Sequence, residues 1–183
     1  MTALGAPMAA AGVRLEPLAE RHRAALGAAC AEDAEIWSIY PVSFGPDHFD
    51  ASFDALRARA NVRPFAVFAG ERLAGMTSYL GIDEGQRVLE IGCTYYVPSL
   101  RGTGLNRAVK DQMLARAFAL GFRRVVFRVD ARNARSLAAM AKLGAVREGV
   151  LCADRITWTG HVRDTVLFSI LASEWPRSAT VQP

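Results

Sequence analysis

Cysteine is scarce in this sequence, with only Cys30, Cys93 and Cys152 among 183 residues. An odd number of cysteines, without a CxxC motif or a paired histidine, argues against a disulfide framework and against structural zinc. We therefore expect three reduced thiols, no bound metal and a cytoplasmic location.

Long uncharged segments are also absent. The longest covers residues 1–13, which is shorter than the roughly 18 apolar residues of a membrane-spanning helix. It has no basic residue before its apolar part, so we expect neither a membrane span nor a secretory signal. No repeat, low-complexity tract or Gly/Ser-rich linker divides the chain. We expect one domain over residues 13–175, with a flexible N-terminus at 1–12 and a short tail at 176–183.

Positive charge is concentrated in one part of the sequence. Residues 101–142 hold ten Lys or Arg against two Asp, a net charge of +8, whereas the rest of the chain has a net charge of −4. Such a block suggests an anionic partner, although a solvated helix face is the alternative. Nucleic acid is a third interpretation, but no zinc-finger or RNA-recognition signature accompanies the basic residues.

Apolar periodicity and turn residues divide the chain into helices and strands. Strands are predicted at 13–18, 64–69, 72–82, 87–97, 122–129, 145–151 and 162–171, and helices at 19–31, 47–60, 104–121 and 134–143. Residues 34–46 are irregular and rich in aromatics. This order indicates an α/β fold with one mixed sheet covered by helices.

The segment Arg101-Gly102-Thr103-Gly104-Leu105-Asn106 lies between a predicted strand and a basic helix. Its two glycines let the backbone approach a ligand, and the helix N-terminus favours an anion such as pyrophosphate. The Gly-Lys-Ser/Thr ending of a Walker loop is missing, and Arg107 occupies the place of the third glycine of a dinucleotide fingerprint. A tight turn is the alternative to an anion site.

The run PSLRGTGLNRAVKDQML resembles the coenzyme A pyrophosphate loop of the GNAT acetyltransferase superfamily, whose pattern is Arg/Gln-x-x-Gly-x-Gly/Ala. Arg101 and Gly104 match this pattern, and Asn106 departs from it. LEIGCTYYVP, VDARNARSLAAMAKLGAVREGVL, VRDTVLFSIL and SEWP resemble the branch of the ribosomal-protein N-terminal acetyltransferases RimJ and RimL. The resemblance covers about residues 13–176 and implies a mostly antiparallel GNAT-type sheet with helices on both faces.

By this resemblance, acetyl-CoA would be the cosubstrate. Backbone N–H groups of residues 102–106 (Gly102, Thr103, Gly104, Leu105 and Asn106) would hold its pyrophosphate, with charge added by Arg101 and Arg107. The strand end at Tyr96 and Val97 would pair with the pantetheine arm and polarise the thioester carbonyl. Asn133 and Ser136 would contact the cofactor from the opposite side, and an N-cap pair is the alternative role for them.

Glu90 stands eleven residues before Arg101, in the register of the strand glutamate that serves as base in histone acetyltransferases of the superfamily. Period-two alternation predicts that Glu90, Gly92, Thr94 and Tyr96 share one face of the strand. A carboxylate inside an apolar strand is costly unless it is paired, hydrated or functional. A structural ion pair with an arginine is the alternative to catalysis.

The resemblance departs at the general acid, because Met140 occupies the position where many GNAT enzymes have a tyrosine. Ser136, another hydroxyl or water would have to protonate the leaving thiolate. Trp37 and Tyr40, together with Phe44, lie where the family builds its acceptor pocket. A small core under a loop is the alternative for these aromatics.

Together, these features predict acetyl transfer from acetyl-CoA to a primary amine by direct attack in a ternary complex. The preferred acceptor is the N-terminal amine of a protein or peptide. A small-molecule amine (an antibiotic, a polyamine or an amino acid) and a non-catalytic CoA-binding module are the alternatives. We expect a monomer or homodimer that binds neither nucleic acid nor membrane.

Overall fold

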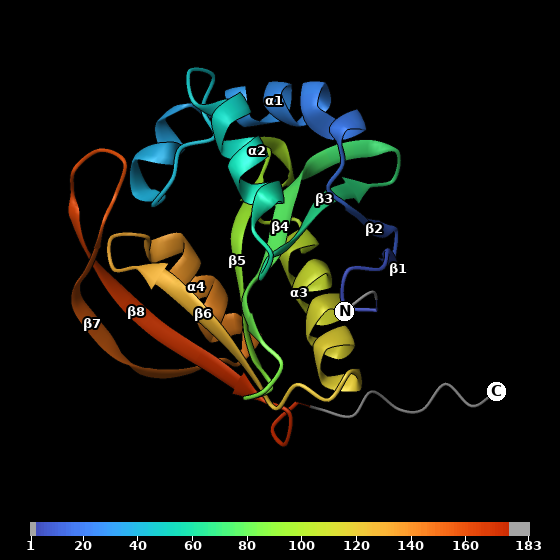
Figure 1. The fold of residues 1–183 in the computed structure, drawn as a ribbon, viewed down its shortest axis with the longest axis vertical. Helices are drawn as coiled ribbons and strands as arrows, with labels where there is room; N and C mark the ends of the chain where they lie inside the picture. The colour runs from blue at the N-terminus through green and yellow to red at the C-terminus, as the bar shows by residue number, and fades with distance from the viewer. Residues whose placement is uncertain (1–2, 176–183) are drawn as a thin grey trace.

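Eight strands form one sheet in the computed structural model, which describes residues 3–175 (Figure 1). The strand order is β1-β2-β3-β4-β5-β6-β8-β7, and only the neighbours β5 and β6 run parallel. The expectation of a single mixed, mostly antiparallel sheet is confirmed. The strands are β1 (Met8–Ala10), β2 (Val13–Pro17), β3 (Arg63–Ala69), β4 (Arg72–Asp83), β5 (Val88–Tyr96), β6 (Arg124–Asp130), β7 (Val146–Ile156) and β8 (Val162–Leu171).

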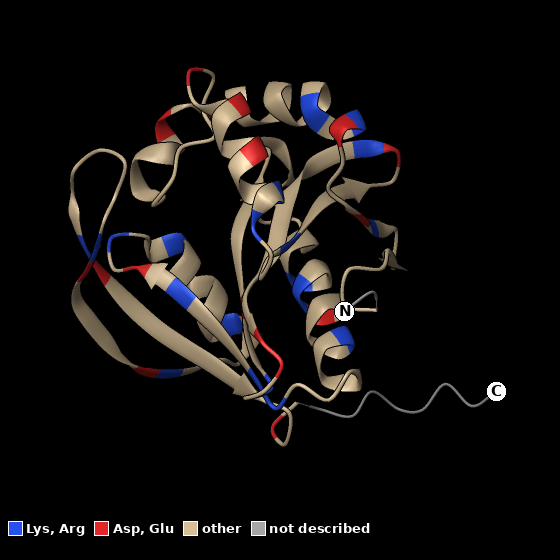
Figure 2. Ribbon diagram, in the orientation of Figure 1, with Lys and Arg blue, Asp and Glu red and all other residues tan. Residues whose placement is uncertain are grey.

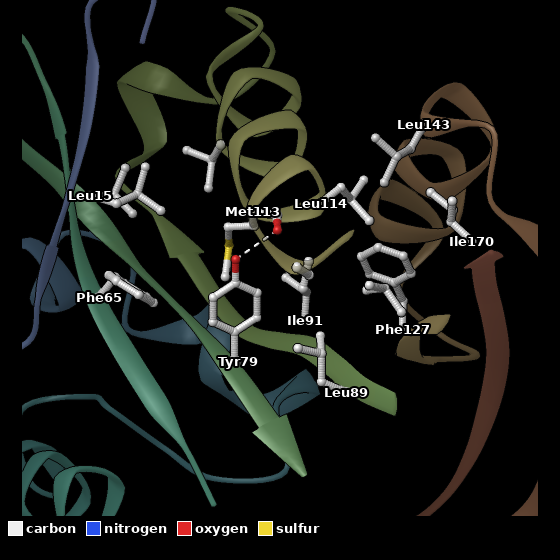
Figure 3. Close-up of a cluster of buried hydrophobic side chains, with 14 of the residues drawn as sticks. Leu15, Phe65, Tyr79, Leu89, Ile91, Met113, Leu114, Phe127, Leu143 and Ile170 are labelled. Atoms are coloured by element: carbon white, nitrogen blue, oxygen red, sulfur yellow. Dashed lines mark hydrogen bonds between the residues drawn. The ribbon is translucent and has the colours of Figure 1, made fainter. Parts of the chain in front are cut away.

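Helices cover both faces of the sheet (Figure 1). Helices α1 (Arg23–Ala31) and α2 (Phe49–Ala58) lie over one face, and α3 (Leu105–Ala119) and α4 (Ala134–Leu143) lie over the other. Figure 2 shows Lys and Arg on α3, β6 and α4, the elements formed by the basic block of residues 101–142. Short 3-10 turns are η1 (Glu20–His22), η2 (Glu35–Ile39) and η3 (Pro98–Leu100). Figure 3 shows the core beneath α3 and α4, where side chains from both helices meet the sheet. None of the helices in residues 3–175 is long and apolar enough to span a membrane.

The N-terminal segment differs from the expected flexible terminus at 1–12. Residues 8–10 form the edge strand β1, and Leu4 and Met8 are buried. The guanidinium of Arg116 on α3 donates to the carbonyl oxygens of Ala3, Ala6 and Pro7. Because these contacts join residues about a hundred positions apart, the local composition of the segment could not predict them. The expected tail at 176–183 lies outside the described residues.

The two parallel strands at the centre separate along their length (Figure 1). Strand β5 pairs with β6 only through Val88–Glu90, opposite Arg124–Val126. Beyond Glu90, the edge of β5 that faces β6 has no strand partner among the described residues. The backbone groups on this edge that no side chain binds are therefore available to a ligand that can complete the ladder.

A β-bulge interrupts the other edge of β5. The register against β4 shifts between the pairs Met76–Tyr95 and Ser78–Gly92, so two residues of β5 oppose one residue of β4. Cys93, one of the two, has φ +49°, a conformation that is unusual for a residue with a side chain.

The bulge overturns the predicted alternation of side chains along β5. Leu89 and Ile91 lie together on the α3 face, in agreement with the alternation. The same alternation would place Tyr95 and Val97 on the α3 face, but both lie on the opposite face. Glu90 and Tyr96 are therefore on opposite faces of the sheet, not on the same face. One inserted residue inverts the alternation of every residue after it, and the period-two pattern carries no sign of the insertion.

Candidate functional site

The loop between β5 and α3 forms a series of unpaired backbone donors. Gly102 and Gly104 have φ values of +80° and +92°, and Gly104 is the N-cap residue of α3. The first helical hydrogen bond runs from Ala108 N to Gly104 O at 3.1 Å. Within residues 3–175, the backbone N–H groups of residues 102–107 have no hydrogen-bond acceptor.

These donors lie at the positive end of the 15-residue helix α3. An ideal Cβ built on Gly102 or Gly104 would meet no atom within 4 Å, so the surface above both glycines is open. Consecutive N–H groups at a helix N-terminus bind anions, and phosphate is a frequent ligand of this arrangement. The geometry therefore suits a bound anion as well as a tight turn.

Arg101 is turned away from this loop, contrary to the expectation that its charge would face the pyrophosphate. Its Nε donates to the carbonyl oxygen of Tyr96 at 2.9 Å, and its Nη1 pairs with the carboxylate of Asp33. The guanidinium also lies over the ring of Tyr95, 5.5 Å from its centroid. Asp33 is 68 residues away in sequence, so the loop motif alone could not predict this orientation.

Arg107 is exposed but already paired. Its Nε donates to both carboxylate oxygens of Asp111 at 2.9 and 2.8 Å, and its Nη1 donates to Lys142 O at 3.2 Å. The side chain therefore links α3 to α4, and its charge is partly neutralised. The backbone donors, and not the two arginines, are the principal groups available to an anion here.

At the end of β5, the backbone groups of Tyr96 and Val97 point to opposite edges of the strand. The N–H of Val97 donates to Ala74 O on β4 at 2.9 Å, so it points away from β6. Because successive residues in a strand direct their backbone groups to opposite edges, the backbone of Tyr96 belongs to the open edge. On that edge, Tyr40 Oη donates to Thr94 O at 2.6 Å.

Glu90 has one bound and one unpaired carboxylate oxygen. Oε2 accepts a hydrogen bond from Arg128 Nη1 at 2.7 Å, so the ion pair considered as an alternative is present. Oε1 has no hydrogen-bond or ion-pair partner within residues 3–175. It would lie only 2.9 Å from a Cβ placed on Gly92. The absence of a side chain at Gly92 thus lets the carboxylate extend along β5 toward the bulge.

Asn133 is the N-cap residue of α4, and its Oδ1 accepts from Ser136 N at 3.0 Å. The capping role expected as an alternative is therefore present. The side chains of Asn133 and Ser136 are half-buried at the start of α4. Met140 is buried beneath α4 and offers no proton donor to the site.

The two predicted acceptor-pocket aromatics have different environments. Trp37 is fully buried, stacks on Tyr95 with 4.8 Å between ring centroids, and donates from Nε1 to Cys30 O. It belongs to the core, which is the alternative considered for these aromatics. Tyr40 is half-buried and reaches the bulge through its hydroxyl.

Nothing in the sequence indicated that the loop between β7 and β8 contacts the segment around Trp37. Trp158 Nε1 donates to Trp37 O at 2.7 Å, and Trp158 N donates to Pro41 O at 3.2 Å. The C-terminal hairpin thereby reaches the segment that follows η2, at one end of the open β5 edge (Figure 1). No group of three or more His, Cys, Asp or Glu residues suited to a metal ion occurs in residues 3–175.

Comparison with known proteins places this arrangement in a family. Residues 13–146 match the model of the acetyltransferase (GNAT) domain. A search of curated protein sequences gives no significant match. The structure is similar to that of a probable GNAT-family acetyltransferase from Chromobacterium violaceum, with 32% identity and a TM-score of 0.88 over 93% of this chain and 88% of that one.

Two further solved structures show the same likeness. A GCN5-related N-acetyltransferase from Brucella melitensis has 29% identity and a TM-score of 0.85, over 93% of this chain and 80% of that one. RimJ of Mycobacterium smegmatis, in complex with CoA-disulfide, has 25% identity and a TM-score of 0.77, over 91% and 85%. Because the family model matches residues 13–146, which are most of this chain, the chain belongs to the GNAT acetyltransferase family.

Proposed function

We propose that this protein transfers the acetyl group of acetyl-CoA to the N-terminal amine of a protein or peptide. The observation that carries the proposal is the row of N–H groups at residues 102–107, which have no acceptor within residues 3–175 and follow the open edge of β5, the strand that also carries Glu90. The similarity to RimJ, whose solved structure is a complex with CoA-disulfide, supports a CoA ligand for this arrangement.

In this proposal the loop and the strand divide the work of binding. The N–H groups of residues 102–107 hold the pyrophosphate, and Arg107 adds charge at the outer rim. The N–H of Tyr96 on the open edge donates to the pantetheine arm, while the carbonyl oxygen of Tyr96 stays bound to Arg101. Asn133 and Ser136 contact the cofactor from the start of α4.

The chemistry requires a neutral amine, because an ammonium group has no lone pair. Glu90 Oε1 accepts a proton from the acceptor amine, directly or through water. The amine nitrogen then bonds to the acetyl carbon, while backbone donors on the β5 edge stabilise the developing oxyanion. The C–S bond breaks, and Ser136 or water protonates the thiolate.

The state of Glu90 bears on the kind of acceptor. One of its oxygens is occupied by Arg128, which leaves a single oxygen for proton transfer. An α-amine has an unperturbed pKa of about 7.7–8.0, whereas a lysine amine has about 10.4, so an α-amine is already partly neutral at pH 7. An N-terminal amine therefore demands less of this base than a lysine or a polyamine does.

The acceptor class can be tested by measuring thiol release from acetyl-CoA with four amines. These are a peptide with a free N-terminus, an N-terminally blocked peptide that contains lysine, spermidine and a free amino acid. We expect the first to give the highest kcat/KM. Faster turnover with spermidine or the amino acid would instead support the small-molecule alternative. Tight CoA binding without thiol release would support the non-catalytic module.

Cofactor binding should raise the melting temperature of the protein, and adenosine alone should raise it far less. The phosphates supply much of the attraction, through the free N–H groups and the positive end of α3. Differential scanning fluorimetry with matched concentrations of CoA and adenosine measures both shifts. Equal shifts would show that the loop does not bind the phosphates.

A further inference from the structure

Lys110 lies in the apolar layer between α3 and the sheet. It is 3% exposed, and its neighbours on α3, Val109, Met113 and Leu114, are fully buried in the core. Burial lowers the pKa of Lys110 to about 7. A buried amine is costly unless its hydrogens find acceptors, and an apolar side chain would serve packing better. The contacts of Lys110 therefore suggest a role other than packing.

These contacts meet at the β-bulge. Lys110 Nζ donates to Thr94 Oγ1 at 2.8 Å and to Thr77 Oγ1 at 3.4 Å, and the two hydroxyl oxygens lie 2.8 Å apart. Thr94 follows Cys93 in the bulged strand, and Thr77 is the β4 residue at which the register shifts. Lys110 thus joins the two strands where their ladder is interrupted.

Thr94 is held from both faces of the sheet. Its hydroxyl contacts Lys110 on the α3 face, while its carbonyl oxygen accepts from Tyr40 Oη at 2.6 Å. Two residues further along β5, Arg101 Nε binds the carbonyl oxygen of Tyr96. Together these contacts fix the backbone of residues 94–96 on the edge that β6 leaves open.

We propose that Lys110 is a positioning residue for acetyl transfer, which holds the bulge so that residues 94–96 meet the thioester carbonyl in the correct geometry. The inference rests on the proposed function, because it places acetyl transfer at this edge. Lys110 acts through Thr94 and does not touch the reacting atoms. Backbone donors are effective only when they are preorganised, and a misplacement of about 1 Å can cost roughly 100-fold in rate.

The test is Lys110→Met, which keeps the length of the side chain and removes its donors. The hydroxyls of Thr77 and Thr94 remain bonded to each other, so neither loses its last partner. A methionine suits the apolar layer, and we expect a folded protein with a melting temperature close to that of the wild type. The affinity for CoA should be unchanged, because Lys110 does not contact the loop, while kcat should fall about 10- to 100-fold.

Tyr79→Phe is the matched control. It removes a buried hydrogen bond between the same strand and helix, from Tyr79 Oη to Met113 O at 2.7 Å (Figure 3), and leaves Thr94 untouched. Its kcat should equal that of the wild type. Thr94→Val should lower kcat as Lys110→Met does, and the double variant should lose no more than the worse single variant, since both act on one contact.

A second measurement does not depend on turnover. An acetyl-CoA analogue with a methylene group in place of the thioester sulfur keeps the carbonyl but cannot transfer the acetyl group. Calorimetry should show that Lys110→Met weakens binding of this analogue relative to CoA by about tenfold, the value of one hydrogen bond.

A folded Lys110→Met variant that keeps both its kcat and its preference for the analogue would overturn the proposal. If the wild type acetylated no amine, the proposed function would fail. The ratio of analogue to CoA affinity would then still decide whether Lys110 positions the β5 edge.

Discussion

Glu90→Gln is expected to lower kcat/KM for the acceptor amine by about 10²- to 10⁴-fold, the usual effect of removing a positioned base. Gln keeps the shape of the side chain but cannot accept a proton at the oxygen that extends over Gly92. Steady-state kinetics across pH measures the effect. The loss should shrink as the pH approaches the pKa of the amine, where solvent has already removed the proton. The affinity for acetyl-CoA should barely change.

Glu148→Gln is the matched control for this variant. Glu148 on β7 pairs with Arg124 on β6 and accepts from Ser169 Oγ, so the substitution also weakens an Arg–Glu pair between strands. We expect it to lower stability and leave turnover intact. If Glu90→Gln behaved in the same way, with a lower melting temperature and full turnover, Glu90 would be a structural partner of Arg128. A water molecule, or an acceptor that arrives neutral, would then take the place of the base.

Gly104→Val is expected to weaken CoA binding by at least about 1–3 kcal/mol, or roughly 5- to 150-fold. Gly104 has φ +92°, which a β-branched residue adopts only with strain. The new side chain would also occupy the open space above the N–H groups of residues 102–107, where the pyrophosphate would approach. Isothermal titration calorimetry with CoA measures the loss directly.

Gly121→Val provides the comparison at the other end of α3. Gly121 has φ +84°, and a Cβ built on it would meet no atom within 4 Å, so the backbone strain is similar. This variant should melt at a lower temperature but bind CoA normally. Unchanged CoA affinity in a folded Gly104→Val protein would exclude the loop as the phosphate site.

The features that sequence could predict are those governed by neighbouring residues. The glycine loop, the start of α3 at Leu105 and the cap of α4 at Asn133 all depend on local backbone preferences. The strands β3, β4 and β8 have near-continuous apolar or alternating patterns, and their observed limits differ from the predicted ones by at most one residue.

The features that sequence could not predict depend on distant contacts. The side chain of Arg101 points away from the loop because it pairs with Asp33. The amine of Lys110 can be buried because the hydroxyls of Thr77 and Thr94, on two strands, accept its hydrogen bonds. The bulge at Cys93 is invisible to a period-two pattern, and it moved Glu90 and Tyr96 to opposite faces. Sequence therefore suggests the residue types of the candidate site, whereas the tertiary contacts set their orientation.

The most direct test of the account is to locate the acetylated nitrogen. A peptide with a free N-terminus and an internal lysine is incubated with the protein and acetyl-CoA, and tandem mass spectrometry maps the product. The account predicts one acetyl group, on the α-nitrogen, and none when the N-terminus is blocked. Acetylation of the lysine nitrogen instead, or no acetylation of this peptide by a folded protein that binds acetyl-CoA, would contradict it.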